Sequence, residues 1–587
     1  MQTRAATFLS LLEHRGERQG SSIAYRFLAD GSDEGESLTF AELDCYGRAI
    51  GAHIQESAER GDRALILAPD GYDFCRAFVA CQYANVIAVP AYPPFPAGSG
   101  QRVQTLRSIA RNCRPRVVLA AGAAADRDAV VAVVPELATA RWLVVDRVVP
   151  GDATRFVPTT VVPEDISFLQ YTSGSTSEPK GVVITHDALM HNERLIASGA
   201  DLSEADIGVS WLPLYHDMGL IGNLLGVVYT ATPGVFMSPM AFLHRPARWL
   251  QAITKYRATI SGAPNFAYDL CVRRISEQER AELDLSSWKL AFSGAEPVRA
   301  ETLDAFARAF GPYGFDPRAW YPCYGLAEST VMVSGAGGPS LGAVRRRVAK
   351  DALAQGRFEE TADADYTEMV GCGTARLHRS IVIADPVTLR RCADGEVGEI
   401  WAAGPDIGRG YWGRPEESEH VFGAHLADTG EGPFLRTGDL GVLRAGELFV
   451  TGRLKDLIII AGRNHYPQDI EATVEAIHPN VRSSIVFTFG ADGAEKLAVV
   501  AETTTRKPEE QVRIERLIRS AVSANHGLRA HRIVLVKPNS VPRTSSGKPR
   551  RSACRTAFQR GELVRLNNPV AVLATERGGH DVDSALS

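Results

Sequence analysis

Short apolar runs alternate with helical patterns in the first part of the chain. Residues 39–54 place apolar side chains at helical spacing behind a Thr cap, and residues 8–57 as a whole predict a helix, a strand and a second helix. Buried strands are expected at four runs rich in Ala, Val, Leu and Ile: 64–69, 86–94, 116–121 and 142–146. Strands that alternate with helices are typical of layered α/β domains with parallel strand pairing.

The pattern changes twice in the second half of the chain. Residues 343–370 are dense in charge and contain no clear strand, so we expect an exposed insertion there. Near residues 451–455 a strand pattern gives way to a polar stretch flanked by glycines, and we expect a domain boundary at this point. Beyond it, residues 509–527 predict an amphipathic helix ended by Gly527, and residues 532–538 predict a strand.

Composition and charge narrow the class of protein. The 587 residues are 45% hydrophobic and 23% charged, which is ordinary for a soluble globular protein and excludes collagen, coiled coil and global disorder. Acidic residues outnumber basic ones, 69 to 64, so nothing indicates a nucleic-acid partner. From residue 453 onward, however, there are 21 Lys and Arg against 14 Asp and Glu. This basic C-terminal part favours an anionic ligand or partner, and a solvated basic face explains it equally well.

The cysteines and the longest apolar stretch bear on location. The 9 cysteines are scattered without a C-x-x-C pair, which fits a reducing cytosol better than a disulfide framework or a zinc site. The N-terminus reaches charged residues too early for a signal peptide. The stretch from Met218 to Leu243 contains Asn223, Pro233 and Pro239, so we expect it to line a core or a pocket and not to cross a membrane. We therefore predict a cytoplasmic protein without a membrane span.

One loop between two apolar strands carries the strongest chemical signal. After the strand-like FLQYT, residues 172–177 contain five hydroxyl side chains and one glycine, and Lys180 and Gly181 lead into the next strand. Small residues let backbone N–H groups approach an anion closely, and the hydroxyls add further donors. The Walker pattern is absent. The loop nevertheless offers what a polyphosphate needs, and its place between two strands argues against a surface linker.

The segment YTSGSTSEPKGV resembles the phosphate loop of acyl-adenylate-forming enzymes, the superfamily of acyl-CoA synthetases, peptide-synthetase adenylation domains and luciferases. Further motifs of that superfamily follow in the expected order. They are FSGAEPV (292–298), YPCYGLAEST (321–330), FLRTGDLG (434–441), GRLKDLIIIAGRNHYPQDIE (452–471) and PRTSSGKPRR (542–551). The resemblance spans nearly the whole chain and implies an enzyme that uses ATP and Mg²⁺.

The resemblance implies a set of nucleotide-binding residues. They are Thr172, Ser173, Gly174, Ser175, Thr176, Ser177 and Lys180 for the phosphates, Gly294, Ala295, Glu296, Tyr324, Gly325, Leu326 and Ala327 for the adenine region, and Asp439 and Arg453 for the ribose. An ionised Asp439 accepts two hydrogen bonds, which suits paired ribose hydroxyls, although Asp also stabilises turns. The Tyr324 ring is suited to stacking on adenine, and a core aromatic is the alternative.

Four more residues receive roles from the same resemblance. Glu328 is expected to bind Mg²⁺ together with phosphate oxygens, unless it is an ordinary surface Glu. Lys548, on a loop of small residues, is expected to stabilise charge as the acyl carboxylate attacks the α-phosphate. Lys455 falls at the superfamily's hinge, with an exposed lysine as the alternative. His216 falls near the acyl carboxylate, and a structural His paired with Asp217 is its competitor.

Residues 211–250 bear on the substrate, because they are apolar and aromatic and offer no acid for the amine of an amino acid. A long apolar slot suits a fatty acyl chain, since each buried methylene contributes about 0.8 kcal/mol. Three segments resemble fatty acyl-AMP ligases: LPLYHDMGLIG, SPMAFLHRPARWL and DLIIIAGRNHYPQDIE. The insertion at 343–370 falls where those ligases carry one that disfavours transfer to free CoA. The resemblance therefore implies that a medium- or long-chain acyl group passes to the phosphopantetheine thiol of an acyl carrier protein or a polyketide or peptide synthase domain.

The resemblance also implies the architecture. Residues 1–451 are expected to form a large domain of stacked α/β sheets with a small β-barrel at 371–450, and residues 452–587 a small mobile α+β domain. Two alternative functions stay open. One is an acyl-CoA synthetase that transfers to CoA. The other is a non-catalytic acyl-adenylate sensor, which has no need of Lys548, Glu328 and Asp439 together.

Overall fold

The computed structural model describes residues 5–94, 100–172, 178–460, 462–491, 494–543 and 550–566. The chain divides into two compact units, with the division between Thr451 and Gly452. The N-terminal unit contains two large sheets, and the C-terminal unit contains a three-stranded sheet and a two-stranded hairpin. Among the helices of the described residues, none combines the length and the hydropathy that a membrane crossing requires.

A six-stranded sheet in the N-terminal unit has the order β6-β5-β3-β4-β7-β8. Its strands pair in parallel, except that β8 runs antiparallel to β7. The four strands predicted early in the chain are confirmed here as β3 to β6. The strands are Arg63–Leu67 (β3), Ile87–Pro90 (β4), Val117–Ala120 (β5), Arg141–Val144 (β6), Ile166–Thr172 (β7) and Lys180–Thr185 (β8).

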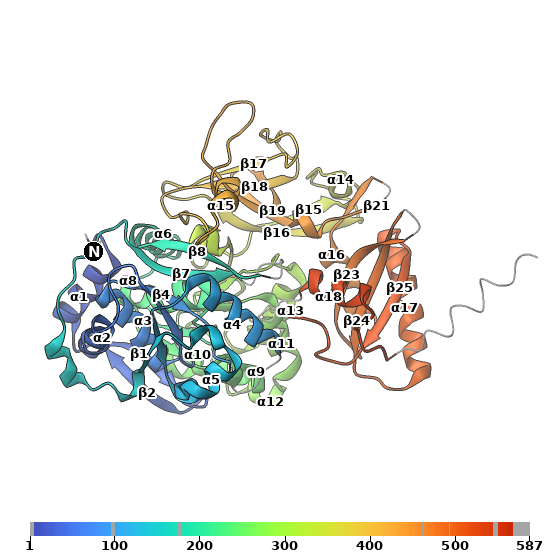
Figure 1. Ribbon diagram of the computed structural model, residues 1–587. Helices are drawn as coiled ribbons and strands as arrows, with labels where there is room; N and C mark the ends of the chain where they lie inside the picture. The colour runs from blue at the N-terminus through green and yellow to red at the C-terminus, as the bar shows by residue number, and fades with distance from the viewer. Residues whose placement is uncertain are drawn as a thin grey trace, which may run out of the picture. The chain divides into compact units, whose positions relative to one another are not determined.

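Helices cover both faces of this sheet (Figure 1). On β3, Ala64 and Ile66 pack into the core formed with α2 and α3, whereas Leu65 and Leu67 pack into the core formed with α4 and α5. A strand that is buried on both faces is apolar at every position, which accounts for its unbroken apolar run. The helices are Phe40–Gln55 (α2), Tyr72–Ala84 (α3), Gly100–Cys113 (α4) and Arg127–Val133 (α5).

The predicted helix, strand and helix at the N-terminus are α1 (Phe8–Gln19), β1 (Ile23–Leu28) and α2. Thr39 caps α2 as predicted: its Oγ1 accepts a hydrogen bond from the Glu42 N–H at 3.2 Å, and Glu42 Oε2 accepts one from the Thr39 N–H at 2.8 Å. An additional strand, β2 (Glu34–Thr39), was not predicted. It pairs antiparallel with β1 while most of its side chains are exposed, so the hydrophobic pattern does not reveal it.

The second sheet has 14 strands and changes from parallel to antiparallel pairing at β13. The large side chains of its core include Trp249, Trp288 and Trp320, which are fully buried. Its further strands are Gly208–Ser210 (β9), Gly234–Phe236 (β10), Ile260–Ala263 (β11), Leu290–Ser293 (β12), Trp320–Gly325 (β13), Met332–Gly335 (β14), Tyr366–Thr374 (β16), Ser380–Ala384 (β17), Gly398–Ala403 (β18), Leu435–Arg444 (β19) and Glu447–Arg453 (β20). The longer helices that accompany it are His186–Ala200 (α6), Ala247–Tyr256 (α10), Asn265–Arg274 (α11) and Ala300–Phe310 (α13). The mixed α/β class predicted for the chain is confirmed, and the strands expected as a barrel, β16 to β20, run in the order β17-β18-β19-β20-β16.

The charged segment 343–370 contains a strand, so the prediction that it lacks one is wrong. Residues Arg345–Ala349 form β15, which pairs antiparallel with β16, and a short helix, α14 (Lys350–Ala354), follows. Val348 is fully buried, whereas Arg346 and Arg347 are exposed. Consecutive arginines hide the alternation on which strand prediction depends, while the backbone pairs regardless of side-chain charge.

The apolar stretch from Met218 to Leu243 contributes to a core, one of the two places predicted for it, and its helical part runs from residue 217 to 230. A π-helical turn, η5 (Leu220–Leu225), contributes four buried side chains to the core under α1 and α3. The other pieces are Asp217–Gly219 (α7), Gly226–Thr230 (α8), β10 and Pro239–His244 (α9).

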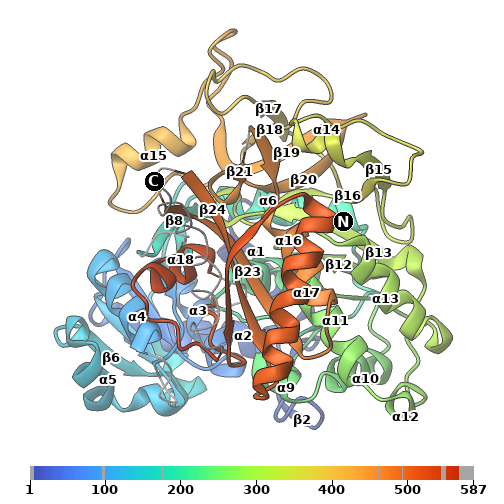
Figure 2. The same ribbon diagram turned by 90° about the vertical axis from the view of Figure 1, so that its right-hand side faces the viewer.

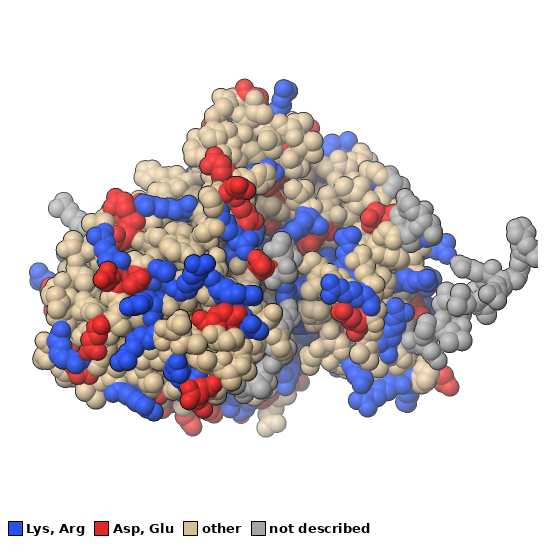
Figure 3. Space-filling model, in the orientation of Figure 1, with Lys and Arg blue, Asp and Glu red and all other residues tan. Residues whose placement is uncertain are grey.

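The C-terminal unit packs helices against a three-stranded sheet of order β23-β24-β25. The predicted amphipathic helix is α17, which buries Ile514, Ile518 and Val522 and ends at Gly527, where φ is +64°. Figure 2 shows α17 beside α16, and Lys and Arg side chains are spread over this unit on the face drawn in Figure 3. The elements are Ile458–Ile460 (β21), Arg463–His465 (β22), Pro467–Ala476 (α16), Val481–Ala491 (β23), Ala494–Thr503 (β24), Pro508–His526 (α17), Ala530–Val536 (β25) and Arg551–Gln559 (α18).

Candidate active site

Two of the motifs end neighbouring parallel strands. Ser293 of β12 pairs with Pro322 of β13, so Gly294, Ala295 and Glu296 lie beside the segment from Tyr324 to Ala327 at the same edge of the sheet. Close backbone approach explains the glycines: a Cβ on Gly294 would lie 2.9 Å from the Cys323 carbonyl oxygen, and one on Gly325 would lie 1.8 Å from that of Val331. The sheet therefore brings these two predicted segments together.

Tyr324 and Asp439 are in contact although 115 positions separate them in the chain. The Tyr324 hydroxyl donates a hydrogen bond to Asp439 Oδ2 at 2.8 Å, and both residues are buried. Asp439 follows Gly438, whose φ is +70°, and the Asp439 N–H donates to Thr437 Oγ1 at 3.1 Å. The Tyr324 ring also packs with the apolar side chains of Val333 and neighbouring residues, so it belongs to a core as well.

A buried ion pair that the sequence analysis missed supports the same turn. Glu399 on β18 accepts hydrogen bonds from Arg436 Nη2 at 2.8 Å, from the Gly438 N–H at 3.1 Å and from Trp401 Nε1 at 2.9 Å. Glu399 lies 37 positions before Arg436, and the two meet because β18 and β19 are antiparallel neighbours. No local pattern could have revealed the pair.

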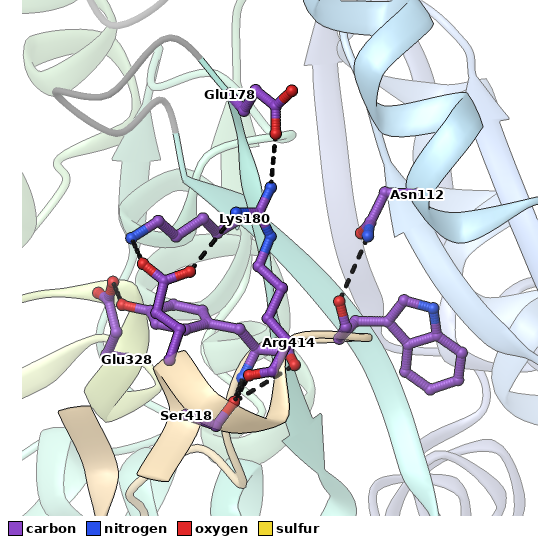
Figure 4. A network of polar contacts seen from close by, with 9 residues as sticks. Asn112, Glu178, Lys180, Glu328, Arg414 and Ser418 are labelled. Carbon is purple, nitrogen blue, oxygen red and sulfur yellow. Dashed lines mark hydrogen bonds and ion pairs between the residues drawn. The ribbon is translucent and has the colours of Figure 1, made fainter. Parts of the chain in front are cut away.

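Lys180 and Glu328 are joined through Tyr411, another residue that the sequence analysis did not single out (Figure 4). The Lys180 ammonium lies 4.9 Å from the centre of the Tyr411 ring, and the Tyr411 hydroxyl donates to Glu328 Oε1 at 2.8 Å. Burial raises the pKa of Tyr411, and the nearby Glu328 carboxylate raises it further, so the hydroxyl stays protonated and acts as a donor.

Ion pairs surround this group. Lys180 Nζ pairs with Glu417 on α15 (Pro415–Phe422), and Arg414 pairs with Glu178 at 2.9 Å and with Glu417 at 3.5 Å. The side chains of Lys180, Arg414 and Glu417 are partly exposed, and that of Glu178 is exposed. A groove of about 670 Å³ lies beside them, and its lining includes Arg409, Tyr411, Arg414 and Ser418.

His216 pairs with the carboxylate next to it. His216 Nδ1 lies 2.5 Å from Asp217 Oδ1, which is the arrangement of the structural alternative. The preceding Leu214 N–H donates to Asp70 Oδ1 at 2.7 Å. Burial raises the pKa of Asp70 to about 7, against the lowering effect of that hydrogen bond. Two carboxylates and an imidazole therefore lie at the start of the apolar stretch.

Some of the predicted residues lie outside the described residues or in the C-terminal unit. Ser173, Gly174, Ser175, Thr176, Ser177 and Lys548 are outside the described residues, and Thr172 ends β7. Arg453 and Lys455 are exposed, and Lys455 lies in the turn Leu454–Asp456. Arg551 pairs with Asp456 at 2.9 Å and with Glu471 at 2.7 Å, which fixes the helix that follows the Lys548 segment.

No cluster of three or more His, Cys, Asp or Glu side chains among the described residues could hold a metal ion. Glu328 offers a single carboxylate, and Mg²⁺ is commonly held by one or two carboxylates together with substrate phosphates. The residues present thus fit a Mg²⁺ that binds with a nucleotide and do not form a complete metal site of their own.

Comparison with known proteins covers both units. A family model described as AMP-binding enzyme matches residues 12–412, and one described as the AMP domain of Disco-interacting protein 2-like proteins matches residues 455–568. The chain is 41% identical to the medium-chain fatty acid–acyl-carrier-protein ligase JamA of Moorena producens (strain JHB), over 99% of each chain.

Solved structures agree with these matches. A fatty acyl-adenylate ligase from L. pneumophila, determined with acyl adenylate and pyrophosphate, is 38% identical with a TM-score of 0.75. A structure from work on fatty acyl-adenylate ligases of E. coli and L. pneumophila is 34% identical with a TM-score of 0.87. Both comparisons cover 96% of this chain and 99% of the other.

Proposed function

The chain belongs to the AMP-binding enzyme family and is a fatty acyl-AMP ligase within it, and from this premise we propose its reaction. The enzyme uses ATP to convert a medium- or long-chain fatty acid into acyl-AMP and pyrophosphate. It then passes the acyl group to the phosphopantetheine thiol of an acyl carrier protein or of a carrier domain in a polyketide or peptide synthase. The observation that carries the proposal is the similarity to a medium-chain fatty acid–acyl-carrier-protein ligase over 99% of both chains.

The proposed roles at the nucleotide begin with its nucleoside end. The Asp439 carboxylate accepts hydrogen bonds from the ribose hydroxyls, with Arg453 assisting, while Tyr324 and the segments 294–296 and 325–327 contact the adenine. The support for this assignment is the 2.8 Å hydrogen bond between Tyr324 and Asp439, which joins the two motifs at one place. Glu399 holds the turn that presents Asp439.

At the polyphosphate end, residues 172–177 and Lys180 bind the phosphates, and Glu328 holds Mg²⁺. When bound, the ion neutralises phosphate charge. The carboxylate of the fatty acid attacks the α-phosphorus, a P–O bond forms, and the bond to the leaving pyrophosphate breaks. Lys548 stabilises the charge that develops during this step, and His216 lies near the acyl carboxylate. Lys455 is the hinge at which the C-terminal unit, residues 452–587, rotates between adenylation and transfer.

In the second step the carrier thiol attacks the acyl carbon, a thioester forms, and AMP leaves. The basic character of the C-terminal unit suits an acidic carrier protein, where charge complementarity mainly speeds encounter. The chain's 9 free cysteines fit a reducing compartment, and we place the enzyme in the cytoplasm.

The test compares products. The purified protein is incubated with ATP, Mg²⁺ and fatty acids of increasing length, and pyrophosphate, acyl-AMP and thioesters are measured with either CoA or a holo-carrier protein as acceptor. Acyl-AMP and acyl-carrier are expected; rapid acyl-CoA formation without a carrier would favour the acyl-CoA synthetase. No pyrophosphate release with any fatty acid would favour the sensor.

The substitution Lys548→Ala tests whether Lys548 takes part in adenylation. We expect adenylation to fall by about 10²–10³-fold, the size usual for the loss of a group that stabilises transition-state charge. ATP binding, measured by calorimetry, should stay close to that of the parent enzyme. Unchanged turnover would remove Lys548 from the mechanism.

A further inference from the structure

The segment 408–412 joins the strand that begins with the candidate phosphate-binding lysine to the turn that carries the candidate metal ligand. On one side, the Trp412 N–H donates to the Gly181 carbonyl oxygen of β8 at 2.8 Å. On the other, the Gly408 N–H donates to the Glu328 carbonyl oxygen at 2.9 Å. Its backbone therefore fixes the spacing between two parts of the site that are distant in sequence.

The side chain of Tyr411 makes a second connection, between the side chains of Lys180 and Glu328 (Figure 4). Its ring lies under the Lys180 ammonium at 4.9 Å, and its hydroxyl donates to Glu328 Oε1 at 2.8 Å. Tyr411 is 8% exposed, packs edge-on against Phe422 at 5.2 Å, and is fixed by the hydrogen bond from its N–H to Ser418 Oγ at 2.8 Å. The side chain is held by Lys180, Glu328 and Phe422 and the backbone by Ser418, so Tyr411 has little freedom to reorient.

We propose that Tyr411 is a positioning residue that orients the Glu328 carboxylate relative to the Lys180 ammonium, so that metal and polyphosphate bind as one group. A hydrogen bond from a second residue fixes the orientation of a metal-binding carboxylate, and an aromatic face stabilises an ammonium. The inference rests on the proposed roles of Lys180 and Glu328, and it adds a residue that acts through both.

The test measures nucleotide binding apart from catalysis. Binding of α,β-methylene-ATP, which cannot transfer its AMP, is followed by calorimetry while Mg²⁺ is titrated. Tyr411→Phe removes only the hydroxyl. We expect the Mg²⁺ concentration that gives half of the maximal increase in nucleotide affinity to rise by about 10–100-fold. This is the usual cost of losing the hydrogen-bond partner of a metal ligand. Affinity at saturating Mg²⁺ should stay within about twofold of the parent, because the ring beneath Lys180 is kept.

Two further variants separate the two contacts. Tyr411→Leu removes the ring as well, and nucleotide affinity at saturating Mg²⁺ should weaken by about two- to fivefold more. Tyr256→Phe is the matched control: its hydroxyl donates to Glu34 Oε1 at 2.8 Å, a contact of the same kind with a carboxylate that belongs to no part of the proposed site. Tyr256→Phe should leave the Mg²⁺ midpoint unchanged. If the control shifts the Mg²⁺ midpoint as much as Tyr411→Phe does, the shift comes from a general loss of structural order and the proposal is overturned.

A double variant shows whether Tyr411 acts through Glu328. Glu328→Gln alone should reduce the increase in nucleotide affinity that saturating Mg²⁺ produces, and adding Tyr411→Phe should reduce it no further. An identical Mg²⁺ midpoint in Tyr411→Phe and in the parent enzyme contradicts the proposal. If Tyr411→Phe fails to fold, Ser418→Ala takes its place, because it removes the hydrogen bond that the Tyr411 N–H donates to Ser418 Oγ. We expect Ser418→Ala to shift the Mg²⁺ midpoint in the same direction by about two- to fivefold. The absence of any shift in Ser418→Ala would also contradict the proposal.

The outcome is independent of the acyl substrate. If no fatty acid releases pyrophosphate, the proposed reaction fails, while the binding titration still decides the role of Tyr411. If adenylation proceeds as proposed and the titrations of parent and Tyr411→Phe coincide, only the positioning role fails.

Discussion

The turn that presents Asp439 is held by buried hydrogen bonds, whereas Lys180 is held by one partly exposed ion pair and by the Tyr411 ring. The side chains of Glu399 and Arg436 are 3% and 16% exposed, and those of Glu417 and Lys180 are 34% and 18% exposed. Buried pairs are weakly screened by salt and costly to break, while exposed pairs are screened and exchange easily. The proposed nucleoside end therefore has the character of a fixed receptor, whereas at the proposed polyphosphate end the Lys180–Glu417 pair can exchange for a pair between Lys180 and a phosphate.

The largest effect is expected at the fixed end. Asp439→Asn keeps the shape of the side chain but removes the charge that the ribose hydroxyls would meet. We expect kcat/KM for ATP to fall by about 100-fold, equivalent to about 2.7 kcal/mol of lost transition-state binding, with little change in KM for the fatty acid. Pyrophosphate release at varied ATP and fatty acid concentrations measures both values.

Glu447→Gln is the matched control for this prediction. Glu447 is a partly buried acid on β20 whose carboxylate accepts a hydrogen bond from the Gly373 N–H at 2.7 Å. It should affect stability without a selective loss for ATP. An equal loss for ATP in both variants would contradict a specific role of Asp439.

The fold was predictable where the burial of an element leaves a recognisable pattern of apolar residues in the sequence. β4 and β5 and most of β3 are apolar because both faces of these strands are buried, whereas the edge strand β6 is only partly buried. The limits of α2 and α17 were predictable from Thr39 at the start of α2 and Gly527 at the end of α17. β2 and β15 were missed for a common reason. Their backbones pair like those of any strand, but their side chains are mostly polar and face solvent.

The candidate site was predictable only where its residues lie within a local motif. Asp439 and Tyr324 could each be found in a motif, but their contact joins β13 and β19, which are separated by three strands in the sheet order. Glu399 and Tyr411 have no local signature, because each acts on a residue 37 or more positions away. Sequence reasoning thus found the groups proposed to touch the nucleotide and missed the groups that hold them.

A smaller effect is expected from the buried support of the Asp439 turn. Glu399→Gln leaves the Arg436 charge in a buried place without its carboxylate partner. We expect the free energy of unfolding of the N-terminal unit to fall by about 2–4 kcal/mol, and the affinity for ATP to fall with it. Denaturant unfolding followed by circular dichroism measures the first effect and calorimetry the second.

Glu431→Gln provides the comparison for the buried pair. Glu431 pairs with Arg391 at 2.6 Å, and their side chains are 49% and 46% exposed. Its loss should cost less than about 1 kcal/mol. Similar costs for the two variants would mean that burial does not distinguish the pairs and that the contrast between the two ends of the site is wrong.

The smallest effect is expected at the polyphosphate end, and it should be favourable. Glu417→Gln removes a carboxylate that competes with ATP phosphates for the Lys180 ammonium. We expect KM for ATP to fall by about two- to threefold at low ionic strength, and the difference to shrink as salt screens the partly exposed pair. Glu416→Gln, a change of equal charge at the exposed neighbouring position on α15, should not show this salt-dependent gain. A rise in KM for Glu417→Gln would mean that Glu417 holds Lys180 in its working position, and the polyphosphate end would then be as fixed as the nucleoside end.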